Sequence, residues 1–488
     1  MARRKSHPLR ILRIVLASIM LLGLTWLFLD TTGLSTKYLS WMTDLQFVPA
    51  WLNAIGTLSL GALVVVILTI ALTFIYGRLY CSVVCPLGIL QDLFIWLGGR
   101  RWWRRHVKPL ARTRWNYRPN HPWVRATAAV VFLLLLFLWH PIASLFEPYS
   151  LFGRIVRMWD LPLVMTIITA LFFGFIAVWA LRDGRMWCNT VCPVGALLGL
   201  MSKYSIRQLH IDLDKCEGCG TCGTKCKAQC IDMVNHKVDA SRCVDCFDCM
   251  NICPGHAFSF QKPWKEKASK RVDVGNTVID MGVDNSRRQF MAMTGALAVA
   301  AAASAQHKTT DGGLAIIEDK QVPPRQVPLK PAGSVSLRDF TIICTSCQLC
   351  VTACQEKVLR PSTKLETLLQ PELHYENGYC LPGCTRCGDI CPTGAITPIT
   401  KEQKTTIQIG HAVWIAENCL VLSDGEVCGN CARHCPTGAI QMVPNAQGQA
   451  VPAVDTEKCI GCGHCEYVCP SRPFSAIYVE GNLHHRTI

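Results

Sequence analysis

The sequence lacks the motifs on which nucleotide chemistry and hydrolysis usually depend. It has no P-loop, no Rossmann glycine pattern in a strand-to-helix context, and no supported Ser-His-Asp arrangement. Its glycine-rich pieces lie in cysteine loops or linkers, and its 14 histidines are scattered. These absences argue against a pocket for two-electron chemistry on a substrate.

Charge is also scarce, and acidic charge most of all. Charged side chains make up 17% of the 488 residues, and 34 acidic residues face 49 basic ones, which gives a net charge of +15. Half of the residues are hydrophobic, and the mean hydropathy is +0.25. The chain is therefore too apolar for an ordinary soluble protein, although its length allows about three domains of roughly 150 residues.

Four long apolar runs account for much of this composition. They cover roughly residues 11–29, 58–76, 126–145 and 161–181. Each is near the ~20 residues that a helix needs to cross the hydrocarbon core of a bilayer. We therefore expect an N-terminal α-helical membrane bundle with four transmembrane helices.

The basic residues give these spans a direction. They gather before the first run and between the second and third, where Asp92 is the one acid, whereas residues 30–54 contain only Lys37. Since Lys and Arg prefer the cytoplasmic side, both ends of the four-span unit are expected inside. We interpret the basic connection as a topology signal in contact with lipid, and we expect no nucleic acid as a partner. Its basic residues are Arg78, Arg100, Arg101, Arg104, Arg105, Lys108, Arg112, Arg114, Arg118 and Arg125.

The second and fourth runs end in the same motif. GRLYCSVVCPLGIL starts at Gly77 and GRMWCNTVCPVGAL at Gly184. The repetition predicts two helix pairs whose cysteines meet at the cytoplasmic face. Four thiols at one place could hold a metal or cluster, or cycle as dithiols; alternatively, cysteine packs there as a small apolar residue. The candidate catalytic residues are Cys81, Cys85, Cys188 and Cys192.

Two further cysteine runs follow the spans, with the spacing C-x2-C-x2-C-x3-C. This spacing, repeated, is typical of bacterial ferredoxins with two [4Fe–4S] clusters, in which the fourth cysteine of each run binds the other cluster. Zinc sites use pairs rather than such runs, and disulfides are not expected in the cytoplasm. The predicted ligand sets are Cys216, Cys219, Cys222 with Cys253, and Cys243, Cys246, Cys249 with Cys226. Cys230 is left over as a packed or incidental thiol.

The same pattern returns near the C-terminus and predicts four more clusters. Two of its runs depart from the ideal spacing, with three residues between Cys380 and Cys384 and eight between Cys419 and Cys428. We expect the extra residues to loop out. The predicted sets are Cys344, Cys347, Cys350 with Cys391; Cys380, Cys384, Cys387 with Cys354; Cys419, Cys428, Cys431 with Cys469; and Cys459, Cys462, Cys465 with Cys435. All 24 cysteines in the six sets are predicted iron ligands.

An export signal stands in the middle of the chain, where NSRRQFMAMTGALAVAAAASAQ covers residues 285–306. Paired arginines before an apolar run are typical of twin-arginine export, which moves folded, cofactor-loaded domains. We expect the run to stay as a fifth, signal-anchor helix; cleavage after Ala305 and a chance arginine pair are the alternatives. The predicted division is 1–205 membrane domain, 206–262 ferredoxin, 263–284 linker, 285–306 signal or anchor, 307–338 linker, and ferredoxin units at 339–400 and 409–480.

These features resemble two families joined in one chain. Residues 1 to about 262, with four spans, two C-x3-C-P motifs and a two-cluster ferredoxin, resemble NapH-type membrane quinol dehydrogenases, whose relatives include the NosR and MauN proteins. Residues from about 285 onward, with S-R-R-x-F and four cluster patterns, resemble the exported NapG/MauM-type ferredoxins. The fold implied is an α-helical membrane bundle with three α+β ferredoxin-like units.

The resemblance implies an electron carrier in the bacterial inner membrane that oxidises quinol. The N-terminus and first ferredoxin would be cytoplasmic, and the later ferredoxins periplasmic, where they would serve an extracytoplasmic reductase or cytochrome. A maturation or regulatory factor, or a relay fed by a cytoplasmic donor, are the alternatives. Glu147 could accept a quinol proton, although an interfacial surface carboxylate is the simpler interpretation. His140 could bind haem but is more simply structural.

Overall fold

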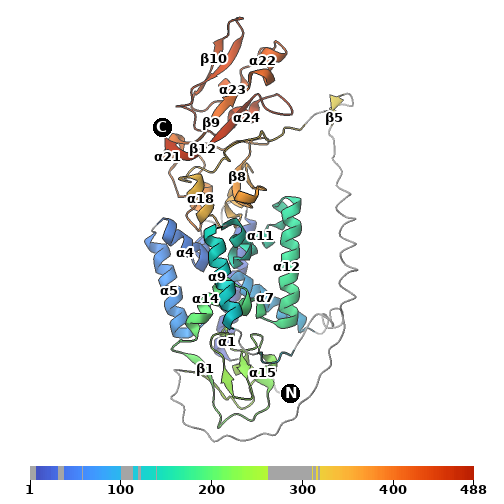
Figure 1. Cartoon of the computed structure of the whole chain (residues 1–488), viewed down its shortest axis with the longest axis vertical. Coiled ribbons are helices and arrows are strands. Elements are labelled where there is room, and N and C mark those ends of the chain that lie inside the picture. Colours follow the sequence, from blue (N-terminus) through green and yellow to red (C-terminus); the bar gives the residue numbers. More distant parts are fainter. Residues whose placement is uncertain are drawn as a thin grey trace.

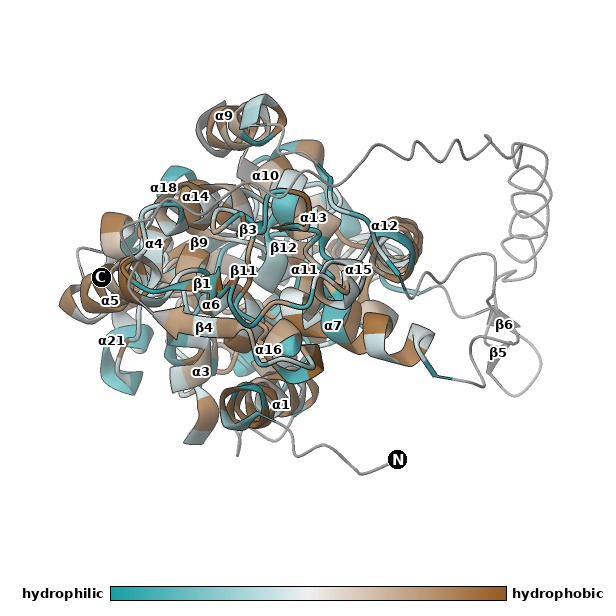
Figure 2. Ribbon diagram, turned by 90° about the horizontal axis from the view of Figure 1, so that it is seen from below, coloured by the Kyte–Doolittle hydropathy of each residue, from teal (hydrophilic) through white to brown (hydrophobic). Residues whose placement is uncertain are grey.

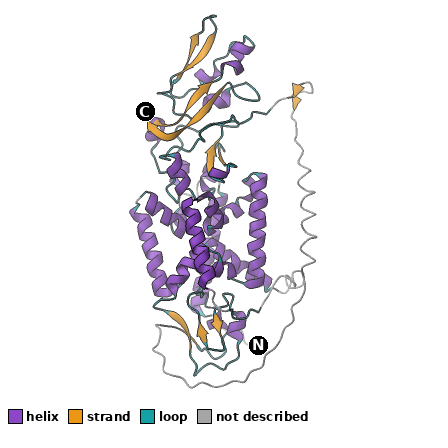
Figure 3. Ribbon diagram, viewed as in Figure 1, coloured by secondary structure: helices purple, strands orange, loops and turns teal. Residues whose placement is uncertain are grey.

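The computed structural model describes residues 7–30, 38–57, 59–100, 114–118, 122–138, 140–261, 310–311, 315–316 and 319–488. The expected linker at 263–284 and the expected export signal at 285–306 lie outside these residues. So does the side chain of His140. Among the described residues, helices fill the middle of the molecule and strands gather at its two ends (Figures 1 and 3).

Helices occupy all four apolar runs of the sequence. Two of them, α1 and α12, are long and apolar enough to cross a bilayer by length and composition. Large apolar side chains point outward from the bundle, as with Leu22, Leu133 and Leu171, which are 69%, 53% and 62% exposed, and Figure 2 shows the apolar colour on α1, α5 and α12. The helices at the runs are α1 (Pro8–Leu29), α5 (Leu60–Tyr76), α9 (Pro122–Leu138), α10 (His140–Phe146) and α12 (Leu163–Asp183).

Glycines end the helices of the second and fourth apolar runs. Gly77 follows α5 with a φ of +82° and Gly184 follows α12 with a φ of +65°, a backbone region open mainly to glycine. After each turn the chain forms a short helix and then a second helix that begins with proline at its first position. These are α6 (Tyr80–Val83) and α7 (Pro86–Gly98) in the first motif, and α13 (Met186–Thr190) and α14 (Pro193–Ser202) in the second.

The connections between the first and second apolar runs and between the third and fourth contain helices that the sequence pattern did not predict. Residues 30–54 form α3 (Trp41–Asp44) and most of α4 (Phe47–Gly56), and residues 146–160 form α11 (Pro148–Val156) and the short helix η1 (Met158–Asp160). Glu147 caps α11 by accepting the backbone N–H groups of Tyr149 and Ser150. It is 2% exposed, so its interpretation as a surface carboxylate is wrong.

A small α+β unit closes one end of the helical layer. Its outer strands pair antiparallel, with Gln208 opposite Gln261 and Ile211 opposite Phe258, and cysteines make up much of its core. Its elements are β1 (Gln208–Ile211), α15 (Thr221–Lys225), β2 (Ile231–Asp232), β3 (Lys237–Val238), α16 (Asp248–Ile252) and β4 (Phe258–Gln261). In Figure 1 it lies below the helices.

The C-terminal elements lie at the opposite end (Figure 1). They share one continuous core from Leu329 to Val479, and their strands form antiparallel pairs, β7 with β8, β9 with β12 and β10 with β11. Before them come β5 (Thr310–Asp311) and β6 (Ala315–Ile316). The elements are α18 (Leu337–Ile343), α19 (Leu349–Ala353), β7 (Leu359–Pro361), η2 (Leu365–Thr367), β8 (Pro371–Leu373), α20 (Arg386–Asp389), α21 (Lys401–Thr406), β9 (Ile407–Trp414), η3 (Ala416–Asn418), α22 (Leu420–Ser423), α23 (Asn430–Arg433), β10 (Ile440–Pro444), β11 (Ala450–Val454), α24 (His464–Val468) and β12 (Ile477–Thr487).

Candidate iron–sulfur sites

Five of the six predicted cysteine sets surround hollows in the protein. The hollows open partly to solvent and measure 280 to 470 Å³ with that open space included. Each is lined by three cysteines of one run and the fourth cysteine of another, as the crossed pattern requires. The sets are Cys216, Cys219, Cys222 and Cys253; Cys344, Cys347, Cys350 and Cys391; Cys354, Cys380, Cys384 and Cys387; Cys419, Cys428, Cys431 and Cys469; and Cys435, Cys459, Cys462 and Cys465.

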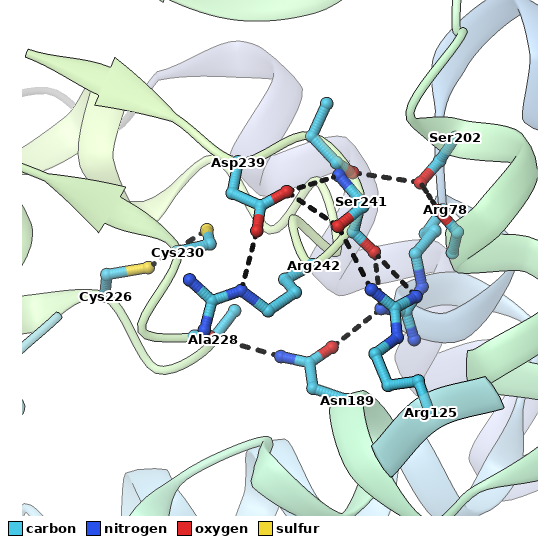
Figure 4. A network of polar contacts seen from close by, with 12 residues as sticks. Arg78, Arg125, Asn189, Ser202, Cys226, Ala228, Cys230, Asp239, Ser241 and Arg242 are labelled. Carbon is cyan, nitrogen blue, oxygen red and sulfur yellow. Dashed lines mark hydrogen bonds and ion pairs between the residues drawn. The ribbon is translucent and has the colours of Figure 1, made fainter. Parts of the chain in front are cut away.

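The sixth set, Cys226 with Cys243, Cys246 and Cys249, lies in the core of the first α+β unit. Its thiols interact electrostatically with one another. The leftover Cys230 is buried beside them, with its Sγ 3.5 Å from the Sγ of Cys226. Cys230 is therefore a neighbour of the set rather than a thiol remote from it (Figure 4).

In the four runs with regular spacing, the backbone bends in the same way around the second cysteine of the run. The residues just before and after that cysteine have positive φ, as Gly218 and Gly220 do around Cys219. Alternation of left-handed and ordinary residues turns backbone N–H groups toward a common point and forms a nest for anionic clusters. The other flanking pairs are Asp245 and Phe247, Ser346 and Gln348, and Gly461 and Gly463.

The two runs with irregular spacing accommodate their extra residues in different ways. The residues after Cys419 form the short helix α22 before the chain returns to Cys428. In the other run, Lys404 from α21 reaches into the loop, and its Nζ lies 3.3 Å from the Sγ of Cys380 and 2.7 Å from the carbonyl of Leu381. Lys404 is only 7% exposed, so a buried cation faces this set.

The chemistry of these sets fits a cluster better than a single ion. Among the described residues, no three His, Cys, Asp or Glu side chains converge closely enough to hold one metal ion, whereas a four-iron cube spreads its thiolates around a hollow. Burial raises the pKa of the Cys246, Cys344 and Cys462 thiols to about 12. Bound iron would therefore have to displace their protons.

The four cysteines of the repeated motifs also come together, although not at the surface of the helical layer. All four are 4–5% exposed and share one apolar core with Phe47 of α4 and Leu151 of α11. The sequence predicts that the four cysteines meet at the cytoplasmic face. They do meet, and Arg78 and Asn189 of the two motifs contact the first ferredoxin beside them; the side of the membrane stays a prediction.

Each motif holds the other through its arginine. Arg78 Nη2 donates to the carbonyl of Cys188 at 2.9 Å, and Arg185 Nη1 donates to the carbonyl of Cys81 at 2.7 Å. Gly88 and Gly195 make room for these contacts, because a Cβ at either position would collide with the cysteine carbonyl of its own motif. The shared G-R-x-x-C and C-P-x-G pattern is thus the signature of a reciprocal clasp.

Polar side chains of the helices also hold the first ferredoxin. Arg78 and Arg125 both donate to the carbonyl of Ser241, and Asn189 donates to the carbonyl of Ala228, as Figure 4 shows. Arg78 and Arg125 are 0% and 5% exposed. The interpretation of the whole basic connection as a lipid-facing topology signal is therefore wrong for these two residues.

Asp92, the one acid of that connection, is the centre of a buried ion network. It pairs with Arg13 of α1, with Arg185 of the second motif, and with Lys227 of the ferredoxin. Lys227 also pairs with Asp248 at 3.1 Å. Burial raises the pKa of Asp248, but Lys227 and Arg10 outweigh it and hold that pKa well below its usual range.

The second ferredoxin part docks at the opposite end through close apolar contact. Cys347, Leu349 and Ile390 pack in one core with Phe28 and Phe152 of the helices. Asn53 of α4 donates to the carbonyl of Pro392 at 3.3 Å. A Cβ at Gly153 in α11 would lie 2.6 Å from the carbonyl of Cys347, so a side chain there would separate the two surfaces.

The fold and these cysteine sets define an electron-transfer protein of the ferredoxin type. Profiles described as a 4Fe-4S binding domain and a 4Fe-4S dicluster domain match residues 58–105 with 165–211, and residues 426–472. The first profile spans both repeated motifs. No solved structure matches the chain significantly.

The relatives give the family. The ferredoxin-type protein NapH of Escherichia coli is 30% identical over 42% of this chain and 68% of its own length. The methylamine utilization ferredoxin-type protein MauM of Methylophilus methylotrophus is 30% identical over 32% of this chain and 72% of its own length. The putative electron transport protein YccM of E. coli is 27% identical over 42% of this chain and 58% of its own. The chain belongs to the NapH/MauN-like family of ferredoxin-type iron–sulfur proteins.

Proposed function

We propose that the protein is an electron relay in the bacterial inner membrane that oxidises quinol and passes electrons one at a time to a reductase or cytochrome outside the cytoplasm. The observation that carries this proposal is that the two α+β parts, whose cores contain the cysteine sets, lie at opposite ends of one apolar helical layer (Figure 1). Four crossing helices, two of them long enough by themselves, form the membrane part.

The six ligand sets give the relay its capacity. Six [4Fe–4S] clusters on 24 cysteines correspond to about 24 irons per chain. Two sets belong to the first ferredoxin and four to the two C-terminal units. Each set takes a single electron, so the two electrons of a quinol leave in separate steps while its two protons go to water.

The distribution of arginine and lysine sets the direction of the relay. It favours a cytoplasmic N-terminus and first ferredoxin. The C-terminal units then lie in the periplasm, to which the twin-arginine machinery would export them already loaded. The separation of the two ferredoxin parts by the helices supports their placement on opposite sides of the membrane.

The test is anaerobic oxidation of duroquinol by the purified full-length protein, followed by cluster absorbance and electron paramagnetic resonance. We expect duroquinol to reduce part of the clusters that dithionite reduces. Clusters that respond to dithionite but never to duroquinol would refute the quinol step. Iron near the load of a single cluster would refute the relay.

A second candidate function is a relay fed by a soluble cytoplasmic donor. The observation in its favour is Cys219, which is exposed while the other 28 cysteines are buried or half-buried. A ligand at the surface brings its cluster within reach of a docking ferredoxin or flavoprotein. Reduction by such a donor but not by duroquinol would favour this function. A maturation or regulatory role would instead give no sustained turnover with either donor.

A further inference from the structure

Two residues beyond the repeated motifs, one pair of matching positions differs in charge. Asp92 follows Cys85 by seven residues and pairs with Arg185 through both carboxylate oxygens. The matching residue after the second motif is Gly199, and a side chain there would collide with Arg125. The first arginine of the clasp, Arg78, therefore has no carboxylate where its counterpart has Asp92.

Arg78 is fully buried, and its guanidinium donates to neutral acceptors among the described residues. These are the Asn189 side chain at 2.7 Å and the carbonyls of Cys188 and Ser241 at 2.9 and 3.3 Å. The nearby Asp245 accepts the backbone N–H of Arg78 and interacts electrostatically with it, but it is not among the hydrogen-bond acceptors of the guanidinium. Since a buried cation with no anion in direct contact is costly, this arrangement favours further negative charge beside the guanidinium. The Sγ of Cys81 lies 3.9 Å from Arg78 Nη2.

Two buried donors beside the same cysteines have no hydrogen-bond partner in the described part of the chain. They are Nε2 of Gln91 and Nε of Arg78, and both residues are 0% exposed. An unpaired buried donor costs free energy. Gln91 already meets Cys188, whose thiol donates to Oε1 at 3.4 Å. A half-turn of the amide would present its N–H to a Cys188 thiolate.

We propose that Cys81, Cys85, Cys188 and Cys192 bind a further iron–sulfur cluster inside the helical layer, with one cysteine pair from each motif. Thiolates on such a cluster place negative charge in direct reach of Arg78, which otherwise interacts with Asp245 without a hydrogen bond from its guanidinium, and supply the acceptor that Gln91 Nε2 lacks. The absence of a convergent single-ion site among the described residues favours a cluster over zinc. The 4Fe-4S profile covers both motifs.

The site lies between the two ferredoxin parts, and the inference rests on the proposed relay. On one side, Arg78 touches the carbonyl of Ser241, two residues before the ligand Cys243. On the other side, Leu151 packs in the thiol core, and Gly153 in the same helix lies so near the carbonyl of Cys347 that an added Cβ would be 2.6 Å from it. One electron enters from one end and leaves toward the other, and no bond forms or breaks.

The experiment compares three anaerobically purified full-length proteins by native mass spectrometry and by iron and sulfide content. They are the unmodified protein, Cys85→Ser/Cys192→Ser, and the control Cys230→Ser. Serine keeps the capping geometry at the start of α7 and α14. We expect the double variant to lose one cluster and the control to lose none. Equal cofactor mass in the double variant and the unmodified protein would overturn the site.

If the double variant does not accumulate, the iron content of the unmodified protein tests the site. Cluster iron beyond the about 24 atoms of the six ferredoxin sets supports the site, and no excess overturns it. A disulfide between motif cysteines without extra iron also overturns it and assigns dithiol chemistry to the core. A retained extra cluster without duroquinol oxidation would refute the quinol donor alone, whereas quinol oxidation without the extra cluster would refute this inference alone.

Discussion

The two ferredoxin parts dock on the same helical layer by opposite means. The first is held by buried charge, with Asp92 and Asp248 shared among Arg10, Arg13, Arg185 and Lys227. The second is held by apolar packing around Phe28, Phe152 and Cys347. An ion network needs all its members, whereas an apolar interface needs close contact, so different substitutions should loosen each end.

The largest effect is expected at the charged end. Asp92→Asn leaves Arg13 and Arg185 without their shared carboxylate, and breaking a buried pair costs about 3–5 kcal/mol. We expect a matching loss of unfolding free energy and faster hydrogen exchange in residues 243–253. The control is Asp160→Asn, because the Asp160 side chain is 40% exposed where it pairs with Arg157. Equal losses of unfolding free energy in Asp92→Asn and Asp160→Asn would contradict the claim that the ion network anchors the first ferredoxin.

The steric counterpart lies at the apolar end. Gly153→Val places side-chain atoms against the Cys347 carbonyl, 2.6 Å from the new Cβ, and overpacking of this kind costs about 1–3 kcal/mol. Hydrogen exchange should rise in residues 344–353 and stay unchanged in residues 243–253. Gly174→Val is the matched control, since nothing lies within 4 Å of its Cβ. If both ends loosened together, the two interfaces would not be independent.

The two ferredoxin parts should differ in how strongly acid destabilises them. Burial lowers the pKa of His485 to about 4, in β12 where it meets the segment at Val335. The unfolded chain binds this proton near its ordinary pKa of about 6.5, so stability falls as pH drops from there toward 4, by up to about 2 kcal/mol at pH 5. Asp248 has a depressed pKa in the folded protein. The first ferredoxin therefore keeps the stability contributed by this carboxylate until the pH falls below about 3.9, the ordinary pKa of aspartate. Chemical unfolding measured at neutral pH and at about pH 5 checks this prediction.

His485→Gln provides the control for the acid effect. It removes the titrating ring, so the C-terminal units of this variant should lose less stability between neutral pH and about pH 5. An unchanged pH profile in the variant would show that another group causes the acid sensitivity.

The smallest effect concerns the cluster potential next to Lys404. A buried cation beside Cys380 stabilises the more negative reduced form of the cluster, as Lys227 beside Cys246 would do at the other end. Lys404→Met should lower one midpoint potential by about 40 mV, the one-electron equivalent of about 1 kcal/mol. Lys401→Met, on the exposed face of the same helix, should leave all potentials unchanged. Potentiometric titration with electron paramagnetic resonance distinguishes the two variants.

Much of this architecture could be predicted because its signals are local. The apolar runs predicted the main helices, and the cysteine spacing predicted which thiols would gather in each hollow. Cys253 and Cys469 could be assigned to distant runs only because the crossed pattern of ferredoxins is regular.

The rest depended on contacts that leave no periodic trace. Asp92 and Arg78 looked like members of a basic surface loop, and only folding shows that they are buried partners of distant residues. The conserved spacing within the repeat did contain a signal, since both motifs begin with Gly-Arg. Lys404 could not be found, because its position in a polar stretch is that of an ordinary surface lysine. The helices α4 and α11 were missed because short amphipathic helices between apolar runs resemble loops.

The central claim is that electrons cross from one ferredoxin part to the other through the helical layer. The most direct measurement uses the full-length protein in sealed liposomes that contain ferricyanide, with dithionite added outside. We predict that the enclosed ferricyanide is reduced at a rate well above that of protein-free liposomes, and that Cys85→Ser/Cys192→Ser slows this rate strongly while Cys230→Ser does not. Reduction of the outward-facing clusters with no loss of enclosed ferricyanide would contradict the account.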